Sequence, residues 1–195
     1  MGTEKIRNGV LHLTYLLGFL FYVHSYLLVY VNSSYLGQFI SEKAIGVVFI
    51  ISSIVAILGL IYAEKILVRY GIYKMMFVGI IINFLLTITL AISKNLLLIL
   101  PAFIFGQLFV RILLFNLDVL LEKNTNERQT GKIRGIFLTI TNIAVVISPF
   151  ISGSIIENGD YKNVYLLSSI ILIPILFLLF SKFRKYNKID YVRHP

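Results

Sequence analysis

Six apolar stretches, each close to the length that crosses a lipid bilayer as a helix, constrain this chain more than any other feature. A hydrocarbon core about 30 Å thick is spanned by roughly 20 helical residues. The stretches cover residues 10–31, 44–62, 75–92, 96–121, 135–156 and 164–181. With 58% hydrophobic and 14% charged residues, the chain is far more apolar than soluble domains, which carry roughly 25% charged residues. The sequence therefore predicts an all-α membrane protein with six transmembrane helices.

Basic residues fall mainly in alternate loops. Of the 18 Lys and Arg residues, only Lys43, Lys94 and Lys162 lie in the first, third and fifth loops, and Arg111 lies inside a stretch. The remainder lie in the N-terminal segment, the second and fourth loops and the tail. Because basic loops stay on the cytoplasmic side, we expect a multi-pass protein of the cell (inner or plasma) membrane with both termini cytoplasmic. Topology then accounts for the net charge of +9, and no nucleic-acid partner is expected.

The chain contains a weak internal repeat. A shift of 88 residues places the first three stretches on the last three and aligns residues 71–74 with residues 159–162 through shared Gly, Tyr and Lys. Because each copy has three spans, the second copy would be inverted, as in many secondary transporters; chance alignment of six similar stretches is the alternative. We accordingly divide the chain into a cytoplasmic segment 1–9, a membrane domain 10–181 with repeats 10–92 and 96–181, and a basic cytoplasmic tail 182–195.

The fourth stretch carries a polar stripe. Arg111 lies near its middle, where an unpaired charge costs at least about 2.5–3.5 kcal/mol, so its side chain should face protein or water. At 100° per residue, Gln107, Arg111 and Asp118 fall within about 40° of one another. Such a stripe suits the path of an anionic or polar solute. The alternative is that an ion pair, with Asp118 as one candidate partner, neutralises Arg111 and only stabilises the bundle.

The first stretch has a polar side of its own. Five residues share that side and predict a second wall of a cavity: Thr14, Gly18, Tyr22, Ser25 and Asn32. His24 points away from them, among apolar residues. A hydrogen bond between helices is the preferred interpretation of His24, and proton coupling is the alternative.

Small residues and a proline mark the fifth stretch. Ala144, Ser148 and Ser152 recur every four residues, which allows close approach of another helix. Pro149 should bend this helix. A neighbouring face carries Gly135, Thr139, Asn142, Pro149 and Gly153, and Asn142 is a further candidate for the solute path.

Together these features resemble the N-terminal six-helix half of major facilitator superfamily transporters over nearly the whole chain. The family pattern Gly-x-x-x-Asp-Arg-x-Gly-Arg-Arg corresponds to residues 64–73, where Arg69 and Gly71 match and Val68 replaces the aspartate. The family pattern Gly-x-x-x-Gly-Pro-x-x-Gly-Gly corresponds to residues 144–153, where Pro149 and Gly153 match and the small residues Ala144, Ser148 and Ser152 stand at the other glycine positions.

The resemblance implies one six-helix bundle of a secondary active transporter, or half-transporter, that moves a small solute by alternating access. The solute-path candidates are Arg111, Gln107, Tyr22, Ser25 and Asn142, with His24 as a less favoured proton site. The gating and motif candidates are Arg69, Gly71, Asp118, Glu122, Ser148, Pro149 and Gly153, and Arg69 is expected to pair with Asp118 or Glu122. The resemblance also implies a partner bundle: a C-terminal half, a second copy or a separate chain.

Other functions have less support in the sequence. A non-transporting six-span scaffold or assembly protein needs only packing surfaces, and it is the main alternative. An intramembrane enzyme is less favoured, because no clustered catalytic motif is present. We expect no cofactor and no metal site. Because no ATP-binding loop occurs, transport would use an ion gradient or facilitated diffusion.

Overall fold

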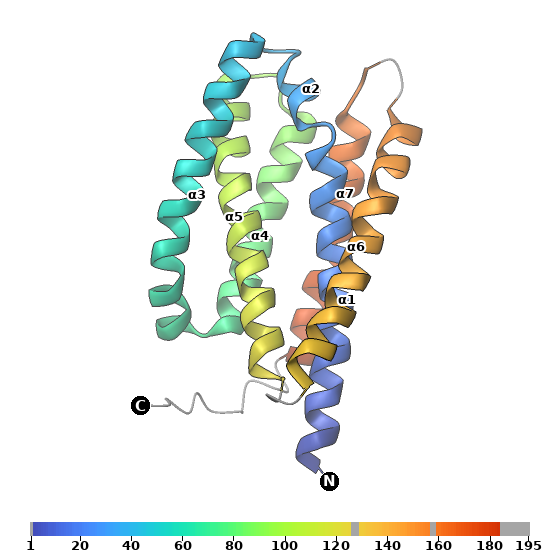
Figure 1. Cartoon of the computed structure of the whole chain (residues 1–195). Helices are drawn as coiled ribbons and strands as arrows, with labels where there is room; N and C mark the ends of the chain where they lie inside the picture. Colours follow the sequence, from blue (N-terminus) through green and yellow to red (C-terminus); the bar gives the residue numbers. More distant parts are fainter. Residues whose placement is uncertain (1, 126–128, 157–158, 184–195) are drawn as a thin grey trace.

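The structure is a computed structural model that describes residues 2–125, 129–156 and 159–183. Long helices run side by side along the bundle (Figure 1): α1 (Gly2–Val29), α3 (Glu42–Tyr70), α4 (Ile72–Ile92), α5 (Leu96–Lys123), α6 (Thr130–Ile155) and α7 (Lys162–Leu178), which continues into the π-helical turn η2 (Leu179–Phe183). All six contain a segment long and apolar enough to cross a membrane, which confirms the six predicted spans. The expected tail from residue 184 onward lies outside the described residues, as does Arg128 of the fourth loop.

The two ends of the bundle differ. The end at which α1 begins also holds the α3–α4 turn and the end of α5 (Figure 1). We call it the basic end, because the described basic residues of the second and fourth loops lie there. Only Gly71 separates α3 from α4, and its φ of 80° is a conformation that residues with a Cβ rarely adopt. The glycine of the loop motif therefore makes this abrupt reversal possible.

Helix contacts follow the predicted repeat. Its first copy comprises α1, α3 and α4, and its second comprises α5, α6 and α7. α1 packs on α6 as α5 packs on α3, α1 packs on α7 as α5 packs on α4, and α4 packs on α7. Exchanging the two copies leaves this set of neighbours unchanged, and three spans per copy make the copies run in opposite senses. The 3+3 inverted repeat is thus confirmed in the packing.

The small-residue ladder of α6 packs closely on α1. Ala144, Ser148 and Ser152 are all buried, and the Ser152 hydroxyl donates a hydrogen bond to the main-chain oxygen of Leu27 at 3.1 Å. From the other side, Gly18 of α1 admits the ring of Phe137, which a Cβ at that position would overlap. These small residues bring the two helices together, as their spacing predicts.

A short helix, α2 (Asn32–Leu36), closes the end opposite the basic end. The Tyr35 hydroxyl donates to the main-chain oxygen of Leu90 at the end of α4, at 2.7 Å. The Tyr165 hydroxyl of α7 donates to Asn32 at 2.8 Å. Burial raises the pKa of Tyr35 to about 12, so its hydroxyl keeps the proton that it donates at neutral pH. These bonds fix α2 to both α4 and α7.

Candidate functional site

A cavity of about 290 Å³ lies between α1, α4 and α5. α1 and α5 form its sides, and α4 contributes Asn83, Thr87 and Leu90. The polar residues that line it are Tyr22, Ser25, Tyr26, Asn32, Asn83, Thr87, Gln107 and Arg111. The polar stripes predicted on the first and fourth spans therefore meet across one cavity.

The predicted solute-path residues divide between the cavity and other places. Arg111, Gln107, Tyr22 and Ser25 all line the cavity. Asn142 is exposed on α6 and is not among the lining residues. Ser25 also donates a hydrogen bond to the main-chain oxygen of Phe21 within α1. The structure thus brings together four of the five candidates.

Two residues of the α1 stripe lie away from the cavity. Thr14 is fully buried, and its hydroxyl donates to the main-chain oxygen of Val10. Gly18 faces the Phe137 ring of α6. These two residues serve the packing of α1, so the cavity wall on this helix begins at Tyr22.

Arg111 lines the cavity from α5. The residue is exposed, and the described part of the chain gives it no ion pair. Tyr22 of α1 lines the same cavity as Arg111 of α5. A cation and a phenol are therefore brought together where α1 faces α5.

Aromatic rings continue the α1 wall. The rings of Tyr22 and Tyr26 stack with centroids 5.8 Å apart and an interplanar angle of 15°, and Tyr26 contacts Tyr30 at 6.5 Å. The Phe137 ring meets Tyr22 edge-on at 6.4 Å. This wall combines apolar ring faces with hydroxyl groups, which suits a solute with both apolar and polar parts.

His24 forms a buried polar link between three helices. Its Nε2 lies 2.9 Å from Nδ2 of Asn83 on α4, and its Nδ1 lies 3.0 Å from the main-chain oxygen of Ser168 on α7. The Ser168 hydroxyl donates to the main-chain oxygen of His24 at 2.9 Å. These polar groups occur where the apolar core cluster of the basic end meets that of the opposite end.

The partners of the ring determine which nitrogen carries the proton. Nδ1 faces the main-chain oxygen of Ser168 at 3.0 Å and its hydroxyl at 2.7 Å. The hydroxyl gives its proton to the His24 main-chain oxygen and a main-chain oxygen only accepts, so Nδ1 donates to Ser168. Asn83 brings its amide nitrogen to Nε2, so Nε2 accepts. The arrangement is that of a neutral imidazole with both nitrogens bonded.

Sequence reasoning missed Asn83 and Ser168 as partners of His24. Both lie on spans that are otherwise almost wholly apolar. The available signal was their isolation, because a single polar side chain in an apolar span usually faces another helix. Its partner could not be read from one sequence, since the periodicity of a helix gives a direction and not a neighbour.

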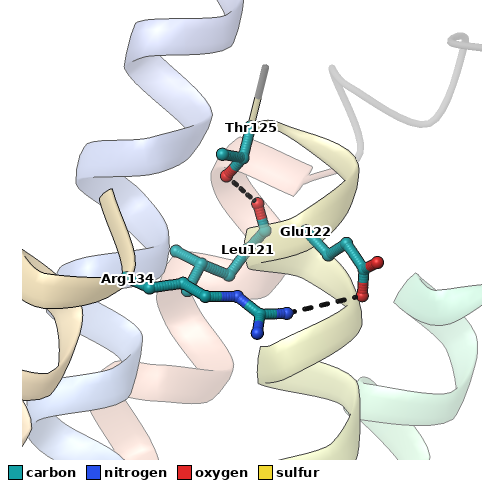
Figure 2. Close-up of polar contacts among 4 residues, drawn as sticks. All are labelled: Leu121, Glu122, Thr125 and Arg134. Atoms are coloured by element: carbon teal, nitrogen blue, oxygen red, sulfur yellow. Dashed lines mark hydrogen bonds and ion pairs between the residues drawn. The ribbon is translucent and has the colours of Figure 1, made fainter. Parts of the chain in front are cut away.

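At the basic end, Glu122 pairs with a different arginine from the one expected. Its carboxylate lies 3.7 Å from the Arg134 guanidinium at the start of α6 (Figure 2), whereas Arg69 has no ion pair among the described residues. The Arg69 guanidinium instead lies 5.4 Å from the centroid of the Tyr70 ring. Asp118 is within electrostatic range of Arg134 and Glu122. The pair that joins α5 to α6 follows from the short connection between these two helices.

The remaining motif residues differ in their surroundings. Ser148 is buried and Pro149 is partly buried, and the Ser148 hydroxyl donates to the main-chain oxygen of Ala144 at 2.6 Å. Gly153 is exposed, with open space where a Cβ would lie.

Thr125 caps the end of α5, because its hydroxyl donates a hydrogen bond to the main-chain oxygen of Leu121 (Figure 2).

Asn116 on α5 was also missed, and it is the most unusual buried residue. It is 0% exposed, and within the described part of the chain neither Oδ1 nor Nδ2 has a hydrogen-bond partner. A buried polar group without a partner costs about 1–3 kcal/mol.

We expect Asn116→Leu to increase the free energy of unfolding by about 1–3 kcal/mol, because it removes that cost. Thermal unfolding in detergent or nanodiscs measures the change. Asn83→Leu is the matched control, since it deletes an asparagine that does have a partner and should lower stability. A loss of stability in Asn116→Leu as large as in the control would contradict the assignment.

These features define a class. Six membrane-spanning helices in an inverted repeat, with a polar cavity between the first helix of each copy, are the architecture of one bundle of a secondary transporter. The sequence profile of the Major Facilitator Superfamily matches residues 14–191, and the chain belongs to this family of membrane transporters. Comparison with curated proteins gave no match.

Proposed function

We propose that this protein moves a small polar solute across the cell membrane by alternating access, through the cavity between α1, α4 and α5. The observation that carries the proposal is the convergence of Arg111, Gln107 and Tyr22 on that cavity from two helices. An arginine exposed within a membrane span has a high cost against lipid. A water-filled path beside it explains why it is tolerated there.

The solute that fits this cavity carries an anionic group. Arg111 offers a planar set of donors suited to a carboxylate or phosphate, and the described residues leave it without an ion pair. Asn83, whose amide nitrogen is engaged by His24, offers its carbonyl oxygen to a donor on the solute. Tyr22 and Tyr26 supply ring faces for an apolar part.

His24 has a structural role in this proposal. Both ring nitrogens are occupied by protein partners, and the residue is fully buried. A proton carrier would need a route to water that these bonds do not offer. Coupling, where it exists, would use other groups such as Asp118, which is exposed on α5.

A second six-helix bundle completes the path in this proposal. Arg111 of the cavity lining and Asp118, two turns further along α5, are both exposed. Lipid against these residues would be unfavourable. A bundle of the same kind, from a longer chain, a second copy or a separate protein, would cover them. The basic end would face the cytoplasm, as the distribution of basic residues favours.

Single cysteines test the water path, because the chain has none of its own. Gln107→Cys, one turn from Arg111, should react with a membrane-impermeant methanethiosulfonate added to either side of oriented vesicles. A sulfonate-bearing reagent should react faster than an ammonium-bearing one, because the Arg111 charge attracts it, and Arg111→Gln should remove that preference.

Ile57→Cys is the control, since Ile57 is exposed on the apolar face of α3 and should stay unlabelled. Labelling of Gln107→Cys from one side alone would refute alternating access. The scaffold alternative would then be favoured, because a scaffold needs no path through the membrane.

A further inference from the structure

A second hollow lies at the basic end and shares no lining residue with the cavity beside Arg111. It is a groove of about 450 Å³ between α3 and α4, with α5 behind it. Its apolar lining includes Ile66 of α3, Val78 of α4 and Phe109 of α5. The groove exists because α3 and α4 both pack on α5 and touch each other little. Gly79, also in the lining, lets α5 pack closely, because a Cβ there would lie 3.2 Å from the Leu113 side chain.

Two cations stand at this groove. Lys74 is exposed and belongs to the lining. The Arg69 guanidinium lies 5.4 Å from the ring centroid of Tyr70, and Tyr70 is itself a lining residue. Among the described residues neither cation has an ion pair. Glu64 is the one acidic residue in the segment 64–74, which also contains Lys65, so the segment keeps a net positive charge.

We propose that this groove binds an anionic phospholipid, with one acyl chain between α3 and α4 and the phosphate at Arg69 and Lys74. The almost wholly apolar lining suits an acyl chain. The groove opens towards the bilayer, whose lipids supply acyl chains. Arginine binds phosphate oxygens through paired donors. Basic residues next to a membrane favour anionic over zwitterionic lipids.

This lipid would link the two helices that meet at Gly71. Of the two expected partners of Arg69, Glu122 pairs with Arg134 instead, and Asp118 forms no ion pair with Arg69 among the described residues, which leaves the Arg69 guanidinium available. A phosphate bridging Arg69 of α3 and Lys74 of α4 would hold the α3–α4 turn to the bilayer surface. The inference is independent of the transported solute.

Native mass spectrometry of the whole protein with phosphatidylglycerol and phosphatidylcholine of identical acyl chains tests the proposal. The protein should bind phosphatidylglycerol more tightly. Arg69→Gln and Lys74→Gln should each weaken phosphatidylglycerol binding about 5-fold, and the double variant about 25-fold, from about 1 kcal/mol per basic residue. Binding of phosphatidylcholine should change little.

Two further sets of variants distinguish binding at this site from non-specific attraction of anionic lipid to the basic protein. Lys94→Gln and Lys162→Gln remove the same charge near the opposite end and should leave phosphatidylglycerol binding unchanged. Val78→Trp keeps every charge, narrows the groove and should weaken binding of both lipids. Equal affinity for the two lipids, or an equal effect of the opposite-end variants, would overturn the proposal. So would unchanged binding in Val78→Trp, because the acyl chain would then lie elsewhere.

Discussion

Replacing Arg111 by Leu is expected to reduce transport by about two orders of magnitude while the protein still inserts and folds. Two charge-assisted hydrogen bonds to an anionic solute, each contributing about 1.5–3 kcal/mol, are lost with the guanidinium. A loss of about 3 kcal/mol corresponds to roughly 100-fold in binding. The described part of the chain gives Arg111 no ion pair, so Leu should leave no carboxylate unpaired and should not reduce stability.

Proteoliposomes provide the measurement. Wild-type protein would be screened with radiolabelled monocarboxylates, dicarboxylates and phosphate esters, and the variants would be compared on the anion that it carries. Arg111→Lys keeps the charge without the planar pair of donors and should retain part of the activity. Asn142→Leu is the matched control, because Asn142 is also a polar residue within a span but does not line the cavity. Full activity in Arg111→Leu would remove the basis of the anion site.

The parts of this protein that could be predicted are those fixed by pattern along one helix. Hydrophobic length located the six spans, and the 3.6-residue period placed Gln107 and Arg111 on one face of α5, where both line the cavity. The same period placed Thr14 and Tyr22 together on α1. Of these two, only Tyr22 reaches the cavity. The Phe137 ring of α6 packs against α1 at Gly18, between them. Periodicity predicts which residues share one face of a helix. It does not predict whether that face lies against another helix or lines a cavity.

Contacts between helices were the least predictable part. Glu122 pairs with Arg134 and not with Arg69, because the connection between α5 and α6 brings their ends together. Asn83 and Ser168 meet His24 although 59 and 144 residues separate them from it in the chain. No pattern within one helix can predict contacts between residues so far apart in the sequence. The expectation that His24 bonds to another helix needed only its apolar surroundings, whereas its partners needed the fold.

His24→Leu is expected to lower the free energy of unfolding by about 1–3 kcal/mol. Leu removes the acceptor of the Asn83 amide and the donor to the Ser168 main-chain oxygen. Hydrogen bonds between membrane helices contribute about 0.6 kcal/mol on average and up to about 1.7. An Asn83 amide left without its partner adds to that loss. Thermal or denaturant unfolding in nanodiscs would measure the change.

A double-mutant cycle isolates the contact between His24 and Asn83. His24→Leu combined with Asn83→Leu should be less destabilising than the sum of the single changes, with a coupling of about 0.5–2 kcal/mol, because no unpartnered amide remains. Ser168→Ala serves as the partial control, since it removes the hydroxyl contacts with the His24 main-chain oxygen and Nδ1 and leaves the Ser168 main-chain oxygen in place. Additive effects of the two Leu substitutions would show that the ring and the amide do not meet.

The protonation state of His24 can be observed directly by ¹⁵N NMR. With His12 and His194 replaced by Gln, the single labelled histidine should show a neutral ring with its proton on Nδ1, because a main-chain oxygen accepts from that nitrogen. The signal should stay constant between about pH 6 and 8, because both ring nitrogens are held by protein partners. A ring protonated on both nitrogens in that range would restore the proton-coupling interpretation, since Asn83 would then have to turn its oxygen toward His24 and its amide nitrogen toward the cavity.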